Sequence, residues 1–306
     1  MTAGNFINLK IEEREHLMSA WIRWNIRSGF NCLTFDRCRL YWNFPATAIK
    51  PHQIYTHQEE IFLQSITENL DERQRLRLKH TVLRQWMISV NKPISDCSRF
   101  PRINIESQSH NFSFSWKFCV ICAKQERSHL GYSYWHKNHQ LSSAGLCDLH
   151  DTPLYYSHDT RRINHLILPH HFLHNNKYLL MHTEQWKDLD WNQFIRNIDY
   201  IMEHRPDHIN VLKSALMNEL GIPDPVRPKH RELIKEISRT MESEIDPNLV
   251  NYICRRPQPG EKNRKEILSP LYLYAEQRKT LIQPSSWLIA LYWLRNKNNA
   301  YQKIFS

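Results

Sequence analysis

Four residues in the middle of the chain have the types and the spacing that bind zinc. Cys119 and Cys122 are separated by two residues, and Cys147 and His150 repeat that spacing further along the chain. Zn²⁺ prefers tetrahedral coordination by thiolate and imidazole, and a two-residue gap lets both members of a pair reach one ion. Four such ligands leave no open position for a water molecule. The pattern therefore predicts one structural Zn²⁺ and argues against a catalytic metal.

Other interpretations of these cysteines remain open. They could be ordinary buried thiols, because a free cysteine packs as a small hydrophobic side chain. Disulfides are disfavoured, because the chain has seven cysteines, an odd number, and no N-terminal apolar stretch that resembles a secretory signal. We therefore expect a reducing, cytoplasmic environment. The cysteines outside the two pairs are predicted to be packing residues: Cys32, Cys38, Cys97 and Cys254.

Residues near the two pairs could support the ion. His139 lies between the pairs and could donate a hydrogen bond to a ligand. Tyr134 and Trp135 are expected to pack against the pairs, with stacking on nucleic-acid bases as the alternative. Residues 170–174, His-His-x-x-His, resemble half of a metal site but lack the glutamate of the zincin helix. Whether the histidines of residues 158–182 hold a second ion is left open.

The composition indicates a globular protein with a basic surface. Of its 306 residues, 41% are hydrophobic and 11% aromatic, which is enough to build buried cores. There are only six glycines and neither a Walker A nor a G-x-G-x-x-G sequence, which argues against nucleotide hydrolysis. No apolar run approaches the roughly 18–20 residues that span a bilayer. The formal net charge of +10 favours a nucleic-acid partner, although acidic protein surfaces would also attract the chain.

Apolar periodicity predicts a mainly α-helical protein with a small β-containing, zinc-ribbon-like module. Successive amphipathic helices in the N-terminal region invite a helix-turn-helix interpretation, and the C-terminal region is helical as well. The module should contain short strands around each ligand pair. The predicted domains are residues 1–105, 106–182 and 183–306. The predicted helices cover residues 12–27, 56–70, 71–90, 183–203, 208–220, 230–241, 247–254 and 285–295.

Several basic residues are candidates for contacts with nucleic acid, because they lie on a predicted helix or in basic loops. For each of them, the alternative is a surface charge that only contacts solvent. The candidates are Arg73, Arg77, Arg84, Arg161, Arg162, Arg255, Arg256, Arg264 and Lys265.

The segment around the ligand pairs resembles a known family. In order, the string is Cys119-x-x-Cys122, Tyr134-Trp135, His139-Gln140-Leu141, Cys147-x-x-His150 and Pro153-Leu154. It is similar to the metal module of the TniQ family, which includes TnsD and comprises transposon target-site selectors. The string departs from the family pattern at Val120 and Ser142, where proline is usual, and at Asp151, where glycine is usual. None of these departures removes a ligand. A looser likeness covers the predicted first helix.

The resemblance implies an adaptor that selects the target site for DNA transposition. Such proteins mark the insertion site and recruit an AAA+ transposition regulator. Some bind attachment-site DNA directly and others dock on a CRISPR RNA-guided effector complex, so either partner is expected here. A second copy of the chain is a further candidate partner, and no membrane is expected.

An adaptor of this kind is bacterial, cytoplasmic and nucleoid-associated, and it is not itself an enzyme. Two other functions stay open on the residues alone. One is a metal-dependent DNA-processing enzyme, which would need carboxylates that converge on a phosphate. The other is a protein-interaction scaffold that makes no contact with nucleic acid.

Overall fold

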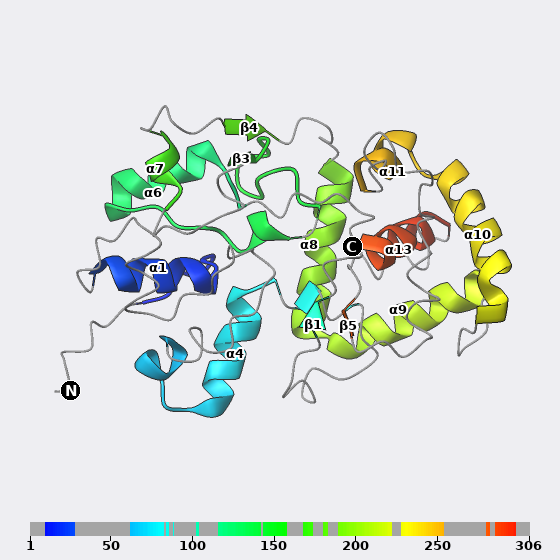
Figure 1. The fold of residues 1–306 in the computed structure, drawn as a ribbon, viewed down its shortest axis with the longest axis horizontal. Coiled ribbons are helices and arrows are strands. Elements are labelled where there is room, and N and C mark those ends of the chain that lie inside the picture. The colour runs from blue at the N-terminus through cyan, green and yellow to red at the C-terminus, as the bar shows by residue number, and fades with distance from the viewer. Residues whose placement is uncertain are drawn as a thin grey trace. The chain divides into compact units, whose positions relative to one another are not determined.

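The described part of the chain is mainly helical and carries two small sheets (Figure 1). A computed structural model of the chain describes residues 10–27, 62–82, 84–85, 88, 102–103, 116–141, 143–157, 168–173, 180–182, 189–221, 228–253, 280–281 and 285–297. The prediction of a mainly α-helical fold is confirmed.

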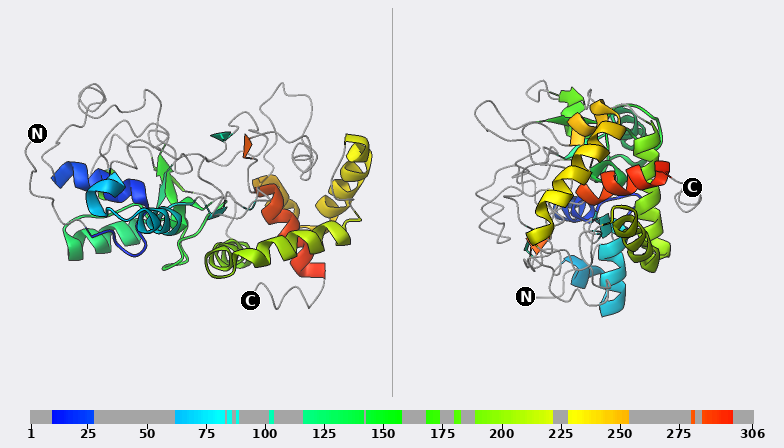
Figure 2. Two further views of the ribbon diagram at one scale, coloured as in Figure 1. Left: turned by 90° about the horizontal axis from the view of Figure 1, so that it is seen from below. Right: turned by 90° about the vertical axis from the view of Figure 1, so that its right-hand side faces the viewer.

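The chain forms two compact units. The first comprises residues 1–83 and 113–187, and the second comprises residues 84–112 and 188–306. The first unit thus contains most of the predicted N-terminal region together with the predicted metal module. Figure 2 shows the helices of each unit from two further directions.

Short helices and a small antiparallel sheet build the first unit. Its strands have the order β2-β3-β4, with Lys117 opposite Tyr156 and Tyr155 opposite His182. The sheet is formed by β2 Lys117–Phe118, β3 Tyr155–Ser157 and β4 Leu180–His182. The helices are α1 Leu17–Arg27, α4 Leu70–His80, α6 Val120–Leu130, α7 His170–Leu173 and the 3-10 turn η2 Asn138–Gln140. Residues 62–66 are helical as well.

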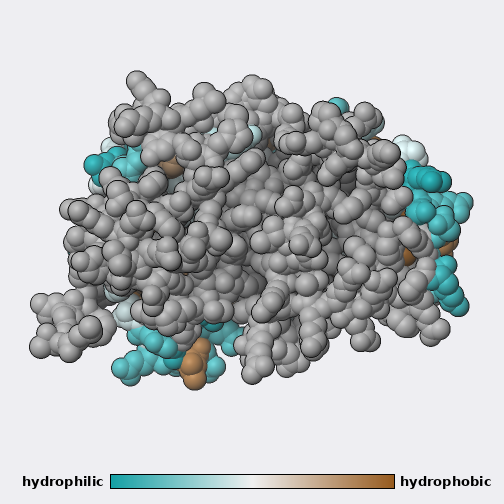
Figure 3. All heavy atoms as spheres, viewed as in Figure 1, coloured by the Kyte–Doolittle hydropathy of each residue, from teal (hydrophilic) through white to brown (hydrophobic). Residues whose placement is uncertain are grey.

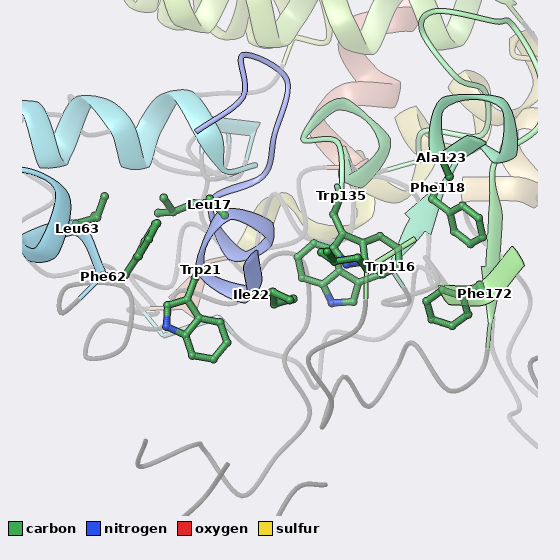
Figure 4. Close-up of a cluster of buried hydrophobic side chains, with 12 residues drawn as sticks. Leu17, Trp21, Ile22, Phe62, Leu63, Trp116, Phe118, Ala123, Trp135 and Phe172 are labelled. Atoms are coloured by element: carbon green, nitrogen blue, oxygen red, sulfur yellow. The ribbon is translucent and has the colours of Figure 1, made fainter. Parts of the chain in front are cut away.

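Aromatic side chains from these elements form one core. The ring centroids of Trp116 and Trp135 lie 5.4 Å apart. The ring centroids of Phe118 and Phe172 each lie 5.9 Å from that of Trp135. Figure 4 shows this group together with the apolar face of α1. Such aromatic clusters bury large apolar areas and so stabilise a unit whose strands are very short. The other members of the core include Leu17, Ala20, Trp21, Ile22, Phe62, Leu63 and Ala123.

The segment before α1 pairs with the chain between the two ligand pairs. Glu15 forms a β-bridge with His136, and the backbone N–H of His16 donates to the carbonyl of Trp135 at 2.8 Å. Ser19 of α1 accepts a hydrogen bond from the Trp135 N–H through its Oγ at 2.9 Å. These bonds join the opening helix to the predicted metal module.

Helix α4 is shorter than predicted. It begins where the Asn69 side chain accepts hydrogen bonds from the N–H groups of Asp71 and Glu72, as an N-cap residue does. The backbone becomes extended at Thr81, with φ −127° and ψ 171°. The single helix predicted over residues 71–90 is therefore interrupted after His80, and residues 84–85 are helical again.

Five helices dominate the described part of the second unit, and they confirm the C-terminal helices that periodicity predicts, with their ends shifted by a few residues. Pro206 starts one helix, and Gly221 follows its end at a left-handed φ of +61°, which suits glycine. The helices are α8 Leu189–His204, α9 Pro206–Glu219, α10 Arg231–Glu244, α11 Pro247–Ile253 and α13 Ser285–Lys297. Strands β1 Arg102–Ile103 and β5 Thr280–Leu281 pair in parallel.

Among the described residues, no helix is both long enough and apolar enough to cross a membrane. The described surface in Figure 3 is largely hydrophilic over α4 and α10, with isolated apolar residues. Leu70 of α4 and Leu233 of α10 are exposed residues of this kind. Single exposed leucines are normal on soluble surfaces and indicate no site by themselves.

An ion pair lies inside the first unit. Both Glu15 and Arg23 are buried, and the Arg23 Nε and Nη2 atoms donate to the Glu15 carboxylate at 2.8 and 2.5 Å. The Arg23 guanidinium also lies 4.4 Å from the centroid of the Tyr132 ring. Burial raises the pKa of Glu15, and Arg23 opposes that rise. The pair is therefore tolerated in the core only because each charge has its partner.

Replacing Arg23 with methionine should destabilise the protein by about 3–5 kcal/mol at neutral pH, because Glu15 would remain buried without its cation. This loss of stability should be smaller at a pH below the pKa of the Glu15 carboxyl group, where Glu15 is protonated. A group whose folded-state pKa is raised stabilises the fold when protonated, and that stability disappears as the pH rises. Denaturant unfolding at two pH values measures both effects.

The control is Arg75→Met, which removes a side chain that is 72% exposed on α4. If Arg23→Met and Arg75→Met unfold at the same denaturant concentration, the Glu15–Arg23 pair has no structural role.

Candidate metal centre

The first ligand pair lies at the junction of β2 and α6. Cys119 occupies the N-cap position of α6 with extended backbone angles, and Cys122 lies in the first turn. Both side chains are buried. A helix N-terminus carries partial positive charge, which favours thiolate over thiol. The short strand β2 and the helix together orient the two sulfur atoms toward the same point.

The second pair lies in a tight turn that a β-bridge between Leu146 and Pro153 closes. The N–H of Cys147 donates to the carbonyl of Thr152 at 2.9 Å, and the N–H of Asp151 donates to the carbonyl of Cys147 at 3.1 Å. Asp151 has a left-handed φ of +48°. Aspartate tolerates this region better than most residues, so the turn forms without a glycine at this position.

The four predicted ligands converge. Their ligand atoms all lie within 4.8 Å of one another. The Cys122 and Cys147 Sγ atoms are 3.6 Å apart, and the His150 Nδ1 atom lies 3.6, 3.3 and 3.5 Å from Cys119, Cys122 and Cys147. With Zn–S near 2.3 Å and Zn–N near 2.05 Å, a tetrahedral ion has edges of about 3.8 Å between sulfurs and about 3.6 Å between sulfur and nitrogen. The cluster thus has dimensions that can hold a metal ion, and we name it the Cys3His tetrad.

The three thiols of the tetrad compete for protons. Hydrogen bonds from Cys122 and Cys147 lower the pKa of Cys119 below its usual range. The hydrogen bond with Cys119, and after it burial, raises the pKa of Cys147 to about 11. Hydrogen bonds with Cys119 and Cys147 raise the pKa of Cys122. Without a cation, one thiolate therefore accepts from two protonated thiols. A divalent ion removes this constraint because it binds all three as thiolates.

Gln125 orients the histidine of the tetrad. Its Oε1 lies 3.2 Å from His150 Nε2, so the ring can donate from Nε2 and present the Nδ1 lone pair to the ion. The sequence pattern alone does not indicate Gln125. It lies three residues after Cys122, so both project from the same face of α6, but this spacing becomes informative only once the helix is known to start at Val120.

Lys117 and Gln140 connect the two halves of the module. Gln140 Oε1 accepts from the Lys117 N–H at 3.0 Å, and Gln140 Nε2 donates to the Lys117 carbonyl at 2.7 Å. The buried Lys117 ammonium group donates to the carbonyls of Leu141 and Ala144 at 3.1 and 2.7 Å. Burial lowers the pKa of Lys117 to about 7. These bonds hold the strand before the first pair against the loop before the second.

The predicted supporting residues lie around the tetrad. Trp135 is fully buried in the aromatic core, so its ring faces protein rather than solvent. Tyr134 stacks on His136 at 4.7 Å. His139 is also buried, stacks on His136 at 4.5 Å, and lies 3.7 Å from Asp148 Oδ1 through Nε2. Among the described residues, no hydrogen bond joins His139 to a residue of the tetrad.

The histidines of the second predicted half-site have other contacts where they are described. His170 Nδ1 contacts the Ser133 N–H and hydroxyl at 3.2 and 2.9 Å. His171 Nδ1 accepts a hydrogen bond from the Leu168 N–H at 2.9 Å. His174 lies outside the described residues, as do His158 and His165.

The structure describes three of the nine candidate nucleic-acid residues, and two of these three are buried. Arg73 is buried and donates to the carbonyl of Glu68 at 3.3 Å, and Arg84 is buried and pairs with Glu203 at 2.6 Å. In this conformation their charges face protein groups. Arg77 is partly buried on α4. The remaining candidates lie outside the described residues: Arg161, Arg162, Arg255, Arg256, Arg264 and Lys265.

No protein-family model matches the chain, and no curated protein matches its sequence. The likeness to target-site selectors therefore rests on the residues of the metal module.

Zinc binding by the metal-free protein near pH 8 should release about two thiol protons rather than three, because Cys119 is already ionised while Cys122 and Cys147 are not. Isothermal titration in buffers of different ionisation enthalpy measures this number. Affinity should fall as the pH drops, since protons then compete for more of the thiolates. Release of three protons at pH 8 would contradict the proposed thiolate–thiol arrangement.

Changing Gln125 to alanine should weaken zinc binding by about 10–100-fold without abolishing it, because the histidine loses the group that orients its ring. Competition with a chromophoric chelator measures the affinity. Lys124→Ala is the matched control, since Lys124 is the exposed neighbour on the same helix. Equal affinities of the two variants would show that the Gln125–His150 contact does not support the metal.

Proposed function

We propose that the tetrad holds one structural Zn²⁺ and that the chain acts as an adaptor that selects the target site in DNA transposition. The observation that carries the first part is the geometry of the tetrad. Its distances match the edges of a tetrahedral ZnS3N site, and four protein ligands leave no position for a reacting water. In this role the ion joins β2 and the start of α6 to the turn that carries Cys147 and His150.

The arrangement of the related string supports the adaptor role. Four positions of this string lie together in the interior, because Trp135, Gln140, Leu141 and Leu154 are all buried within the first unit. Gln140 makes the bonds that hold the module together. The departure at Asp151 is accommodated by a left-handed turn. The string thus behaves as one structural module, as expected if the chain is similar to TniQ proteins over these residues.

Electrostatics fit an adaptor that works on nucleic acid. The net charge of +10 attracts phosphates, whether the chain binds attachment-site DNA itself or docks beside a CRISPR RNA-guided effector. The adaptor would then recruit an AAA+ transposition regulator. We propose that the chain performs no chemistry itself. Asp148, which directly follows Cys147, already accepts hydrogen bonds from Arg14 and Asn138.

The zinc-loaded protein should bind duplex DNA with an affinity that falls as salt increases, with a log–log slope of about −0.9 for each phosphate contact. Cys147→Ser should lose zinc and unfold the module, because metal binding supplies on the order of 10 kcal/mol of folding free energy in zinc-finger peptides. DNA binding should be lost with it. Gel-shift titrations and metal analysis measure both.

Co-purification with an AAA+ regulator and with either effector or attachment-site DNA tests the adaptor role. Binding to protein partners that is insensitive to salt, with no affinity for DNA, would favour the scaffold instead. Reproducible nicking of plasmid with Mg²⁺ or Mn²⁺ that is lost on mutating a carboxylate would establish the DNA-processing enzyme.

A further inference from the structure

An aromatic ring projects from the outward face of α8 in the second unit. Tyr200 is 63% exposed, whereas the opposite face of the helix is buried. The His204 ring stacks on Tyr200, with the two centroids 4.1 Å apart. His204 Nδ1 also lies 3.0 Å from the Tyr200 carbonyl oxygen, and since a carbonyl only accepts, the imidazole donates this hydrogen bond. The Tyr200–His204 stack is therefore fixed on the helix and presents an aromatic surface to solvent.

Basic side chains accompany this stack. Arg196 lies one turn before Tyr200 on the same side of α8, because residues four apart on a helix are neighbours. Among the described residues, the Arg196 side chain makes no ion pair and no hydrogen bond. Where α8 leads into α9 (Figure 1), Arg205 and His208 are exposed as well. Asp207 lies in the first turn of α9, where the helix dipole favours an acid.

The acids of α8 do not neutralise Arg196. Glu203 pairs with the buried Arg84 at 2.6 Å, and Asp190 pairs with Arg295. Asp199 is buried. The outward face of α8 thus combines an exposed aromatic ring with a positive charge that has no acidic partner among the described residues.

A flat ring beside a cation suits an unpaired nucleotide. A base can stack on the open face of a tyrosine ring, and its phosphate can pair with an arginine. The bases of a duplex are stacked on one another, so their faces are not open to a ring on the surface of a helix. An acidic protein surface would pair with Arg196 but would leave the Tyr200 ring without a flat partner.

We propose that the Tyr200–His204 stack and Arg196 bind single-stranded nucleic acid, with one base on the Tyr200 ring and a neighbouring phosphate beside Arg196. This inference rests on the proposed role at nucleic acid and names the form of the strand. A CRISPR RNA-guided complex contains both guide RNA and a displaced DNA strand, and the two share the same bases and phosphates.

Fluorescence anisotropy of the zinc-loaded full chain with oligothymidylate, oligouridylate and a blunt DNA duplex of equal length tests the stack. Tyr200→Ala should weaken single-strand binding by about 5–100-fold, as the loss of one stacked base does, and should leave the duplex affinity unchanged. Tyr200→Phe should bind like the wild type, because it keeps the ring. The strand that loses affinity, DNA or RNA, identifies the source of the nucleotide.

The salt dependence tests the arginine. Arg196→Gln should reduce the steepness of the log–log salt slope for single strands by about 0.7, the value for one phosphate contact. Arg239→Gln is the matched control, because Arg239 is an exposed arginine on α10 of the same unit, and it should keep the wild-type slope. Equal slopes of the two variants would remove Arg196 from the site.

The outcomes separate this inference from the proposed function. Unchanged single-strand affinity of Tyr200→Ala overturns the inference, and so does an equal loss of duplex binding, since no unpaired base would then be recognised. Duplex binding without single-strand binding in the wild type overturns the inference alone, whereas binding to none of the probes also overturns the proposed DNA contact. If the alanine variant does not fold, Tyr200→Gln serves as a second variant without a ring.

Discussion

The Cys3His tetrad brings three sulfur atoms so close together that all three can be negative at the same time only if a cation lies between them. Without it, Cys119 takes the charge and the pKa values of Cys122 and Cys147 rise, so the cluster is only a set of hydrogen-bonded thiols. The surrounding secondary structure is slight, since β2 has two residues and β3 has three. Such short elements bury little surface of their own. Metal bonds can replace part of a hydrophobic core in modules of this size, and the tetrad lies where β2, α6 and the second turn meet.

The ligands and the helices could be predicted from sequence because their signals are local. A two-residue gap specifies each ligand pair, and apolar periodicity specified the C-terminal helices to within a few residues. The contacts that complete the site are not local. The Lys117–Gln140 bonds and the neighbourhood of His139, Asp148 and Cys147 arise only when the two halves of the module fold together. Gln125 lies between these cases, since a correct helix start would have revealed it.

Charged residues were the least predictable from pattern. Arg73 and Arg84 look like surface residues on a basic amphipathic helix, yet both are buried with oxygen partners. The helix also ends at His80, because the backbone of Thr81 is extended. Arginine can be buried wherever a carboxylate or carbonyl accepts its N–H groups, and tertiary structure alone decides where that happens. A count of basic residues therefore describes the electrostatic character of the chain better than it locates a binding surface.

The pairing of residues 14–16 with residues 135–137 has a consequence for biosynthesis. A ribosome adds about 5–20 residues per second, so α1 emerges several seconds before the chain that covers it. During that interval the apolar side chains of Leu17, Trp21 and Ile22 have no aromatic core to enter. Nascent chains that stall before His150 would expose this helix face to chaperones and proteases.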